Sequence, residues 1–311
     1  MNLTRRKFLH LTHTAGLSLP FITGNEFFNL HAKKNKFIEE IGLQLYTVRD
    51  QLVANPMKTL ETIRDLGYKQ VELFDVHLLR RMKSALDNMG MAANSSHFTG
   101  AFLTGNWDLM AVMGVYKPNN YTIDNVVEDG ATYGLQYLVL PFLFPSERDG
   151  LEKCQQIAEK MNRLGEQCKK AGLQLCYHNH ASEFKALYDD GTVPFEVFLQ
   201  EFDPDLVQFE LDVFWLKVAG FDPAQKISEY AGRVKLLHLK DKAEGIPKVF
   251  LGEEQFPDAA FQPVGKGELD FKSILEAAEK AGVQHCFVEQ DASPDPLDSI
   301  SESIRYLKNL P

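Results

Sequence analysis

The stretch "CYHNHASEF" at residues 176–184 holds two histidines and a glutamate within six positions, directly after the apolar run "LQL". Imidazole nitrogens and carboxylate oxygens are ligands for divalent cations and also common proton donors and acceptors in enzymes. Side chains of an extended strand alternate between its two faces, so His178 and His180 share the face of Cys176. The stretch is therefore either a metal-ligand strand end or two core histidines followed by a turn.

Polar residues also end three later apolar runs. Asp212 closes "FELD", His238 lies in "LLHL" and Glu289 lies in "FVEQ". A carboxylate buried without a partner costs several kcal/mol, so acids inside apolar runs indicate a cation or another partner. We predict one divalent metal ion, held by His178, Asp212, His238 and Glu289. Imidazole with carboxylate suits Mn, Co, Fe, Zn or, less well, Mg, and the absence of thiolates disfavours a structural zinc site.

These strand ends belong to a regular pattern that begins at residue 41, in which short apolar or β-branched runs alternate with longer stretches of helical period. The pattern is typical of βα units around a parallel sheet. Several of the helical stretches end in a glycine, which accepts the left-handed backbone that terminates a helix. The eight strand candidates begin at residues 41, 70, 91, 135, 173, 206, 234 and 285.

Eight such units with no internal linker predict an α/β fold, a single parallel eight-stranded (β/α)8 TIM barrel over residues 38–311. An open doubly wound sheet fits less well, and no GxGxxG follows a strand, which argues against a dinucleotide site. Functional side chains of a (β/α)8 barrel project from the C-terminal ends of its strands. The four candidate ligands lie at such ends.

Length and composition indicate a folded globular protein, with 311 residues, 44% hydrophobic and 24% charged. The net charge of −10 and the lack of a basic cluster beyond the N-terminus argue against a nucleic-acid partner. Beyond the N-terminal segment no stretch reaches the length of a membrane span.

The first 35 residues differ from the rest, because the paired arginines of "TRRKFL" precede a moderately apolar stretch that is too short and too polar to span a membrane. This segment resembles a twin-arginine export signal and predicts a periplasmic or otherwise exported protein. No A-x-A cleavage site is visible, and a basic amphipathic N-terminal helix is the alternative.

Motifs along nearly the whole chain after the signal carry a resemblance to a known family. They are "IGLQLYTVRD", "GYKQVELF", "SSHF", "YHNHASEF", "FELDVFWLKVAG", "LLHLKD", "VGKGELDF" and "FVEQD". In this order they resemble the xylose-isomerase-like barrels of sugar and sugar-phosphate isomerases and epimerases. The resemblance implies a metal at the C-terminal face, with Asp212, His238 and Glu289 at three family ligand positions. It also implies a small-molecule sugar or glycoside substrate and allows a homo-oligomer.

The chain departs from this family at the opening stretch. Family members usually carry a glutamate at the end of strand five, where this chain has His178. In the family's epimerases the glutamates of strands five and eight work as bases on opposite faces of the substrate. That symmetric mechanism does not carry over. Glu183 could swing back as the missing carboxylate, or it could cap the segment that follows.

The chemistry expected of this site is proton abstraction next to a carbonyl, with the cation stabilising the enediolate. We predict that Glu289 is a ligand and base, and that His178 is a ligand or second base. Lys240 shares a face with His238, so it could bind a substrate oxygen or a developing negative charge. A surface salt bridge is the alternative for Lys240.

Other residues are predicted around the substrate. Glu72, His97 and Trp215 are candidates for the substrate pocket, and Trp215 could stack on a sugar ring or pack in the core. His180 could support a ligand, contact the substrate or be structural. Glu210 lies one pleat deeper than Asp212 and could support the ligands.

The predicted function is a divalent-metal-dependent sugar isomerase or epimerase that acts on a keto sugar. The first alternative is a 3-keto-glycoside lyase acting by β-elimination, because the two-glutamate pair is broken and phosphorylated sugars are scarce outside the cytoplasm. A non-catalytic sugar-binding barrel is the second alternative. The endonuclease branch of the superfamily uses more histidines and a basic groove, and the acidity of this chain disfavours it.

Overall fold

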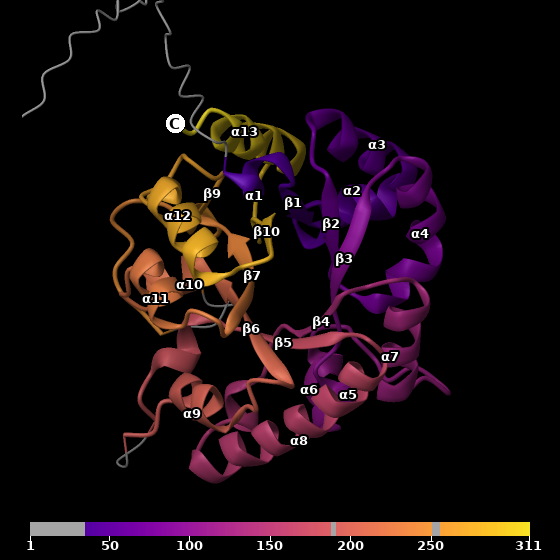
Figure 1. Ribbon diagram of the computed structural model, residues 1–311, viewed down its shortest axis with the longest axis vertical. Helices are drawn as coiled ribbons and strands as arrows, with labels where there is room; N and C mark the ends of the chain where they lie inside the picture. Colours follow the sequence, from indigo (N-terminus) through magenta and orange to yellow (C-terminus); the bar gives the residue numbers. More distant parts are fainter. Residues whose placement is uncertain (1–34, 188–190, 251–255) are drawn as a thin grey trace, which may run out of the picture. The chain divides into compact units, whose positions relative to one another are not determined.

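The computed structural model describes residues 35–187, 191–250 and 256–311. The predicted export signal, except for Asn35, lies outside the described residues. Eight parallel strands close into a barrel (Figure 1), in which each strand pairs with the next along the chain and β10 pairs with β1. The strands are β1 (Gly42–Gln44), β2 (Gln70–Leu73), β3 (Ala92–His97), β4 (Tyr137–Leu140), β5 (Gln174–His178), β6 (Val207–Asp212), β7 (Val234–Leu239) and β10 (His285–Val288).

The predicted fold class is confirmed, and each strand candidate contains one barrel strand. Helices surround the barrel (Figure 1). They are α1 (Lys36–Glu39), α2 (Arg49–Ala54), α3 (Pro56–Leu66), α4 (Leu79–Asn88), α5 (Ala101–Thr104), α6 (Trp107–Val112), α7 (Ile123–Thr132), α8 (Leu151–Lys170), α9 (Pro194–Glu201), α10 (Val213–Val218), α11 (Pro223–Glu229), α12 (Phe271–Ala281) and α13 (Pro296–Lys308). Of the helices in this part of the chain, none combines the length and apolar character needed to cross a bilayer.

The sequence marks the ends of α12 clearly. The Asp270 side chain accepts a hydrogen bond from Ser273 N at 3.2 Å, and this cap satisfies one of the free amides of the first turn. Gly282 ends the helix with φ +85°, a left-handed conformation that costs glycine little. Helix α3 ends in the same way at Gly67, with φ +100°. The predicted helix-ending glycines are therefore confirmed at these two junctions.

The interior of the barrel is layered. Five buried apolar side chains form one cluster, namely Tyr137, Val139, Cys176, Leu236 and Phe287. Two positions further along three of these strands the chain places His178, His238 and Glu289, because side chains alternate with period 2. The polar layer therefore lies on the apolar layer, at the C-terminal ends of the strands. This arrangement positions the functional side chains.

A short antiparallel ribbon follows β7 and consists of β8 (Asp241–Lys242) and β9 (Phe261–Gln262). The buried carboxylate of Asp241 accepts backbone hydrogen bonds from Gly265 N at 2.8 Å and Gly267 N at 2.8 Å. These bonds fix the motif "VGKGELDF" beside the ribbon and lead the chain into α12. The motif has a structural role here, as a turn that leads into a helix.

Candidate metal centre and substrate cavity

Three of the predicted metal ligands converge at the C-terminal ends of β6, β7 and β10. One ligand atom from each of Asp212, His238 and Glu289 lies within 4.8 Å of the others. All three side chains are buried. His238 Nδ1 lies 2.7 Å from Glu289 Oε2, so this edge of the imidazole faces the carboxylate. Parallel pairing sets the convergence, because Asp212 and His238 are direct partners in the β6–β7 ladder.

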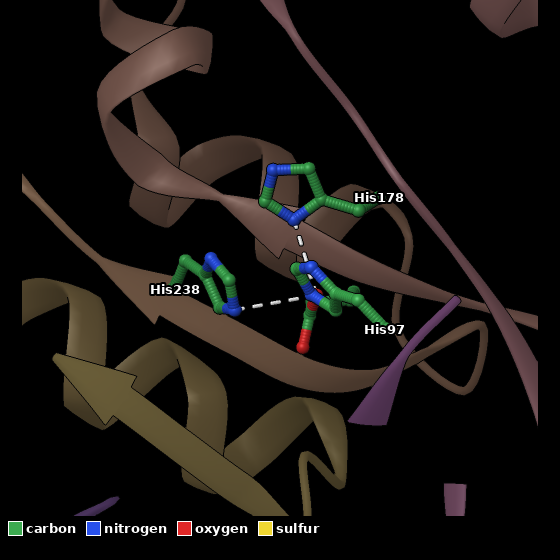
Figure 2. Close-up of side chains that lie close together, drawn as sticks. His97, His178 and His238 are labelled. Carbon is green, nitrogen blue, oxygen red and sulfur yellow. Dashed lines mark hydrogen bonds and ion pairs between the residues drawn. The ribbon is translucent and has the colours of Figure 1, made fainter. Parts of the chain in front are cut away.

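His178, the fourth predicted ligand, lies between this group and a second one. Its Nε2 is 3.8 Å from Asp212 Oδ2, while its Nδ1 is 3.1 Å from Glu210 Oε2. The second group comprises His97, His178, Glu210 and His238, again with ligand atoms within 4.8 Å. The three imidazoles point toward one another from β3, β5 and β7 (Figure 2). The barrel mouth therefore offers two adjacent cation positions that share His238.

Glu210 lies at the centre of the second group. Its Oε2 is 3.0 Å from His97 Nε2, 3.1 Å from His178 Nδ1 and 3.3 Å from His238 Nε2. Burial alone would raise the pKa of Glu210, but the neighbouring imidazoles outweigh burial and lower the pKa to about 2. The Glu210 carboxylate is therefore ionised. It contacts three imidazoles directly, whereas the sequence predicted only that Glu210 could support the ligands from one pleat below Asp212.

Lys240 is buried, so the predicted alternative of a surface salt bridge is wrong. Its Nζ lies 2.7 Å from Glu289 Oε2, 3.0 Å from Asp212 Oδ2 and 2.8 Å from Asp291 Oδ1. The ammonium is the counter-charge of three buried carboxylates. Asp291 was not among the predicted site residues, although it follows Glu289 by two positions and therefore shares its face.

Glu72 was predicted to line the substrate pocket, and this prediction is wrong. The side chain is buried beneath the cluster, with Oε2 at 2.5 Å from His238 Nε2. Gln44 Nε2 donates to Oε2 at 2.9 Å, and Ser95 Oγ donates to Oε1 at 2.5 Å. A carboxylate on one imidazole nitrogen orients the other nitrogen toward a metal. Glu72 therefore positions His238, and the prediction missed its supports Gln44 and Ser95.

His97 and His180 both line the cavity above the cluster, where a side chain can contact a substrate. Burial alone would lower the pKa of His97, but the carboxylates of Glu72 and Glu210 raise it to about 9. For His180, burial dominates and lowers the pKa to about 4. Near neutral pH the cavity therefore presents an imidazolium at His97 and a neutral imidazole at His180.

Trp215 does not line the cavity, so its predicted stacking on a sugar ring is wrong and the core alternative holds. The side chain is 0% exposed, and its ring centroid lies 5.2 Å from that of His180 and 4.8 Å from that of Phe214. The indole backs the His180 imidazole, with Phe256 on another side at 5.4 Å. Its contribution to the site is to hold the His180 ring in place.

Glu183 takes the capping arrangement that the sequence left as an alternative. Its Oε2 accepts from His180 N at 3.2 Å, and its Oε1 accepts from Tyr177 Oη at 3.0 Å. Arg148 Nε lies 3.5 Å from Oε1, so a buried guanidinium balances the charge. These contacts fix the turn after β5, and the geometry gives no support to Glu183 as the missing catalytic carboxylate.

The donor set suits a divalent cation. Among the described residues, Asp212 Oδ2 and Glu210 Oε1 are buried oxygens that accept no hydrogen bond of good geometry. Asp212 Oδ1, in contrast, accepts from Phe214 N at 2.8 Å and caps α10. Carboxylate oxygens beside imidazole nitrogens are ligands for Mn, Co, Zn or Mg. The residues present therefore fit the predicted metal ion, without selecting one element.

A cavity of about 380 Å³ opens above the cluster, within the size range of small-molecule sites. Its polar lining comes mainly from the ends of β5, β7 and β10, and its apolar lining from the ends of β1 to β4 and from residues 110–115. The polar side chains of the first group are His178, His180, Lys240, Glu289 and Asp291, and the apolar side chains of the second are Tyr46, Phe74, Phe98, Met110, Met113, Val115, Pro141 and Phe142.

A closed β/α barrel with buried imidazoles and carboxylates beneath a cavity at its C-terminal mouth defines the class of this protein. The particular family follows from comparison of the sequence with known proteins. The family model described as "Xylose isomerase-like TIM barrel" matches residues 60–310, and the chain belongs to this family. The family resemblance predicted from the motifs is confirmed.

Characterised relatives and solved structures agree with this assignment. An inosose dehydratase from Clostridium perfringens is 26% identical over 166 residues, which cover 50% of this chain and 54% of that protein. The chain thus spans about half the length of the curated relatives it matches. A sugar phosphate isomerase/epimerase from Parabacteroides distasonis has a TM-score of 0.71 and 25% identity, over 90% of this chain and 96% of that one.

A more distant structure, described as the IolI protein with a bound zinc atom, has the same fold. Its TM-score is 0.60 and its identity 14%, over 86% of this chain and 95% of that chain.

Proposed function

We propose that this protein is a divalent-metal-dependent enzyme that removes the proton next to the carbonyl of a keto sugar or keto glycoside. The observation that carries the proposal is the convergence of Asp212, His238 and Glu289 beneath a cavity, with His178 beside them. When bound there, a divalent cation would polarise the carbonyl oxygen and stabilise the negative charge that develops on it.

Glu289 is the base in this proposal. It lines the cavity, and burial alone would raise its pKa, but Lys240 and His238 outweigh burial and lower the pKa. The carboxylate is therefore ionised and able to accept a proton. The Lys240 ammonium donates a hydrogen bond to Asp291 and also lies beside Glu289 Oε2. Lys240 therefore also orients the base.

The environment of His178 favours elimination over epimerisation. Epimerisation needs acid–base groups on both faces of the substrate, and in this chain a histidine stands where the family's epimerases carry the second glutamate. Burial lowers the pKa of His178 well below its usual range, so the imidazole is neutral. The curated relative from Clostridium perfringens is a dehydratase, and dehydration is an elimination.

The proposed reaction on a 3-keto glycoside balances without a further reactant. The bond between C2 and its hydrogen breaks and the proton goes to Glu289, while the electron pair forms a C1–C2 double bond. The bond between C1 and the glycosidic oxygen breaks, and the leaving oxygen takes a proton from the His97 imidazolium, which lines the same cavity. The products are an unsaturated keto sugar and a free alcohol or phenol.

A sugar isomerase or epimerase is the second candidate. It is favoured by the similarity to the sugar phosphate isomerase/epimerase from Parabacteroides distasonis, which this chain matches over most of its length. Both candidates begin with the same proton abstraction, so they differ in the fate of the intermediate. A sugar-binding barrel without catalysis would show neither exchange nor release.

The test uses metal-stripped and Mn²⁺-loaded protein in deuterated water, with 3-keto-glucosides and ketohexoses as substrates. We expect deuterium uptake next to the carbonyl and release of the aglycone, both dependent on the metal. Glu289→Gln should abolish both. Glu276→Gln, on the exposed face of α12, should behave as the wild type.

Exchange with product isomers and no aglycone release would favour the second candidate. The proposal would be wrong if the loaded protein catalysed neither exchange nor release while it bound the keto sugars.

A further inference from the structure

The cavity above the metal centre has two unlike halves. The half formed by the ends of β5, β7 and β10 carries imidazoles, carboxylates and an ammonium. The opposite half, formed by the ends of β1 to β4 and by residues 110–115, is mainly aromatic and aliphatic. Three polar side chains interrupt it, Asp75, His97 and Thr99, and Asp75 already accepts a hydrogen bond from His77 N at 2.8 Å.

A free monosaccharide matches only the polar half. Hydroxyl groups that lose water without gaining hydrogen bonds cost free energy, and this mainly apolar wall supplies few donors or acceptors. A sugar ring bound over the metal centre would therefore leave the other half of the cavity to a part of the substrate that carries few polar groups.

The shape of the apolar half favours a flat ring. Tyr46 and Phe74 meet edge to face, with ring centroids 6.0 Å apart, and Phe142 and His180 form a similar T-shaped pair with centroids 5.5 Å apart. Aromatic rings bind one another in such edge-to-face arrangements, and methionine adapts to ring edges through its flexible thioether. Met113 at the mouth is 61% exposed, an unusual state for so apolar a side chain in the lining of a cavity.

We infer that the substrate is a glycoside with an aromatic aglycone, and that Met110, Met113 and Val115, with the rings of Tyr46, Phe74 and Phe142, form the aglycone subsite. This inference rests on the proposed function for its reactive end. The sugar lies over the metal centre, and the phenolic ring lies in the apolar half, so that elimination releases a phenol.

The first measurement is equilibrium binding without turnover. Phenyl β-D-glucoside and methyl β-D-glucoside lack the keto group and are unreactive, so calorimetry on the Mn²⁺-loaded protein reports binding alone. We expect the phenyl compound to bind roughly thirtyfold more tightly, the factor that corresponds to about 80 Å² of apolar surface removed from water.

The second measurement compares kcat/KM for the phenyl and methyl 3-keto-β-glucosides. The double variant Met110→Ser/Val115→Ser should reduce the phenyl-to-methyl ratio at least fivefold, because it removes apolar contact area from the subsite. Val112→Ser is the matched control. Val112 belongs to the same segment but is 86% exposed and outside the lining, so the ratio should stay at its wild-type value.

Equal binding of the two glucosides, or an unchanged ratio in the double variant, would overturn the inference. If neither keto glycoside is turned over but the phenyl compound still binds more tightly and the double variant removes that preference, the aglycone subsite stands and the proposed reaction fails. If the double variant instead converts a dimer into a monomer and shows no effect on phenyl binding, the wall is a contact between copies and the inference is wrong.

Discussion

Replacement of Lys240 by methionine tests whether the carboxylates around it form a cation site. The ammonium lies 2.7 Å from Glu289, 2.8 Å from Asp291 and 3.0 Å from Asp212, and the side chain is 3% exposed. Methionine keeps the length of the side chain and removes the charge. Three buried carboxylates then lose their shared counter-ion.

The magnitude follows from these contacts. Removing one partner of a buried ion pair costs about 3 to 5 kcal/mol. For a folded unit of this size 1 kcal/mol shifts the melting temperature by about 2 to 4 °C, so metal-free Lys240→Met should melt roughly 6 to 20 °C below the wild type. Two unit charges 4 Å apart repel by about 4 kcal/mol at an effective dielectric constant of 20, so loss of the ammonium should tighten Mn²⁺ binding at least tenfold.

The assay is thermal unfolding by circular dichroism, with a chelator and with excess Mn²⁺. A ligand that binds only the folded state raises its stability by about 2.7 kcal/mol at a hundred times its dissociation constant. Mn²⁺ should therefore raise the melting temperature of Lys240→Met by more than that of the wild type, because the cation replaces the lost charge.

Lys242→Met is the matched control for this experiment. Lys242 is also buried, but its Nζ pairs with Glu268 at 2.8 Å, outside the metal centre. This variant should be less stable than the wild type. Its melting temperature should nevertheless rise with Mn²⁺ by as much as that of the wild type. The reasoning would be refuted if Lys240→Met melted like the wild type without metal, or if Mn²⁺ stabilised it no more than the control.

Three further variants probe single contacts. Glu72→Gln removes the charged acceptor at His238 Nε2 and should weaken Mn²⁺ binding about 10- to 100-fold in calorimetry; unchanged affinity would show that Glu72 does not position the ligand. His178→Glu places a second carboxylate beside Glu210, so the metal-free melting temperature should fall and added Glu210→Gln should restore it; a single variant as stable as the wild type would contradict this. Burial alone would raise the pKa of Glu183, but the Arg148 guanidinium and the hydrogen bond from Tyr177 help to hold it below its ordinary value of 4.5. The carboxylate therefore stabilises the fold above that pH, and this contribution is lost as the pH falls below it. Glu183→Gln should flatten the acid limb of a stability profile measured by urea unfolding, and an acid limb as steep as that of the wild type would argue against the cap.

Strand periodicity accounts for the part of the site that the sequence predicted. Asp212, His238 and Glu289 stand at the ends of apolar runs, and a parallel barrel brings such ends to one face. Their convergence follows from the alternation of side chains within each strand and from closure of the sheet into a barrel. His178 was found in the same way, because it shares the inward face of β5 with Cys176.

Contacts across the barrel could not be predicted, because they join strands far apart in the chain. Glu72 reaches His238 across 166 residues, and the alternation of side chains alone does not say how deep in the barrel a residue lies. Trp215 is of a residue type that can stack on a sugar ring, but its position in α10 directs the side chain into the core. The same inward-face test on β1 would have found Gln44, which shares its face with Gly42.

The apolar wall of the cavity had no signal in the sequence. Met110, Met113 and Val115 lie in and just after the short helix α6, where neither the period of a strand nor a metal-ligand residue type marks them. Only their position over the barrel mouth relates them to the metal centre. A substrate class could therefore be inferred only from the assembled cavity.

Anomalous scattering from a crystal of the protein soaked in Mn²⁺ tests the central claim most directly. We predict one strong peak per chain, from an ion bound by Asp212, Glu289 and His238 Nδ1. His178 should lie beside this ion. A peak among His97, His178 and Glu210, or no peak at the barrel mouth, would contradict the assignment of the metal centre.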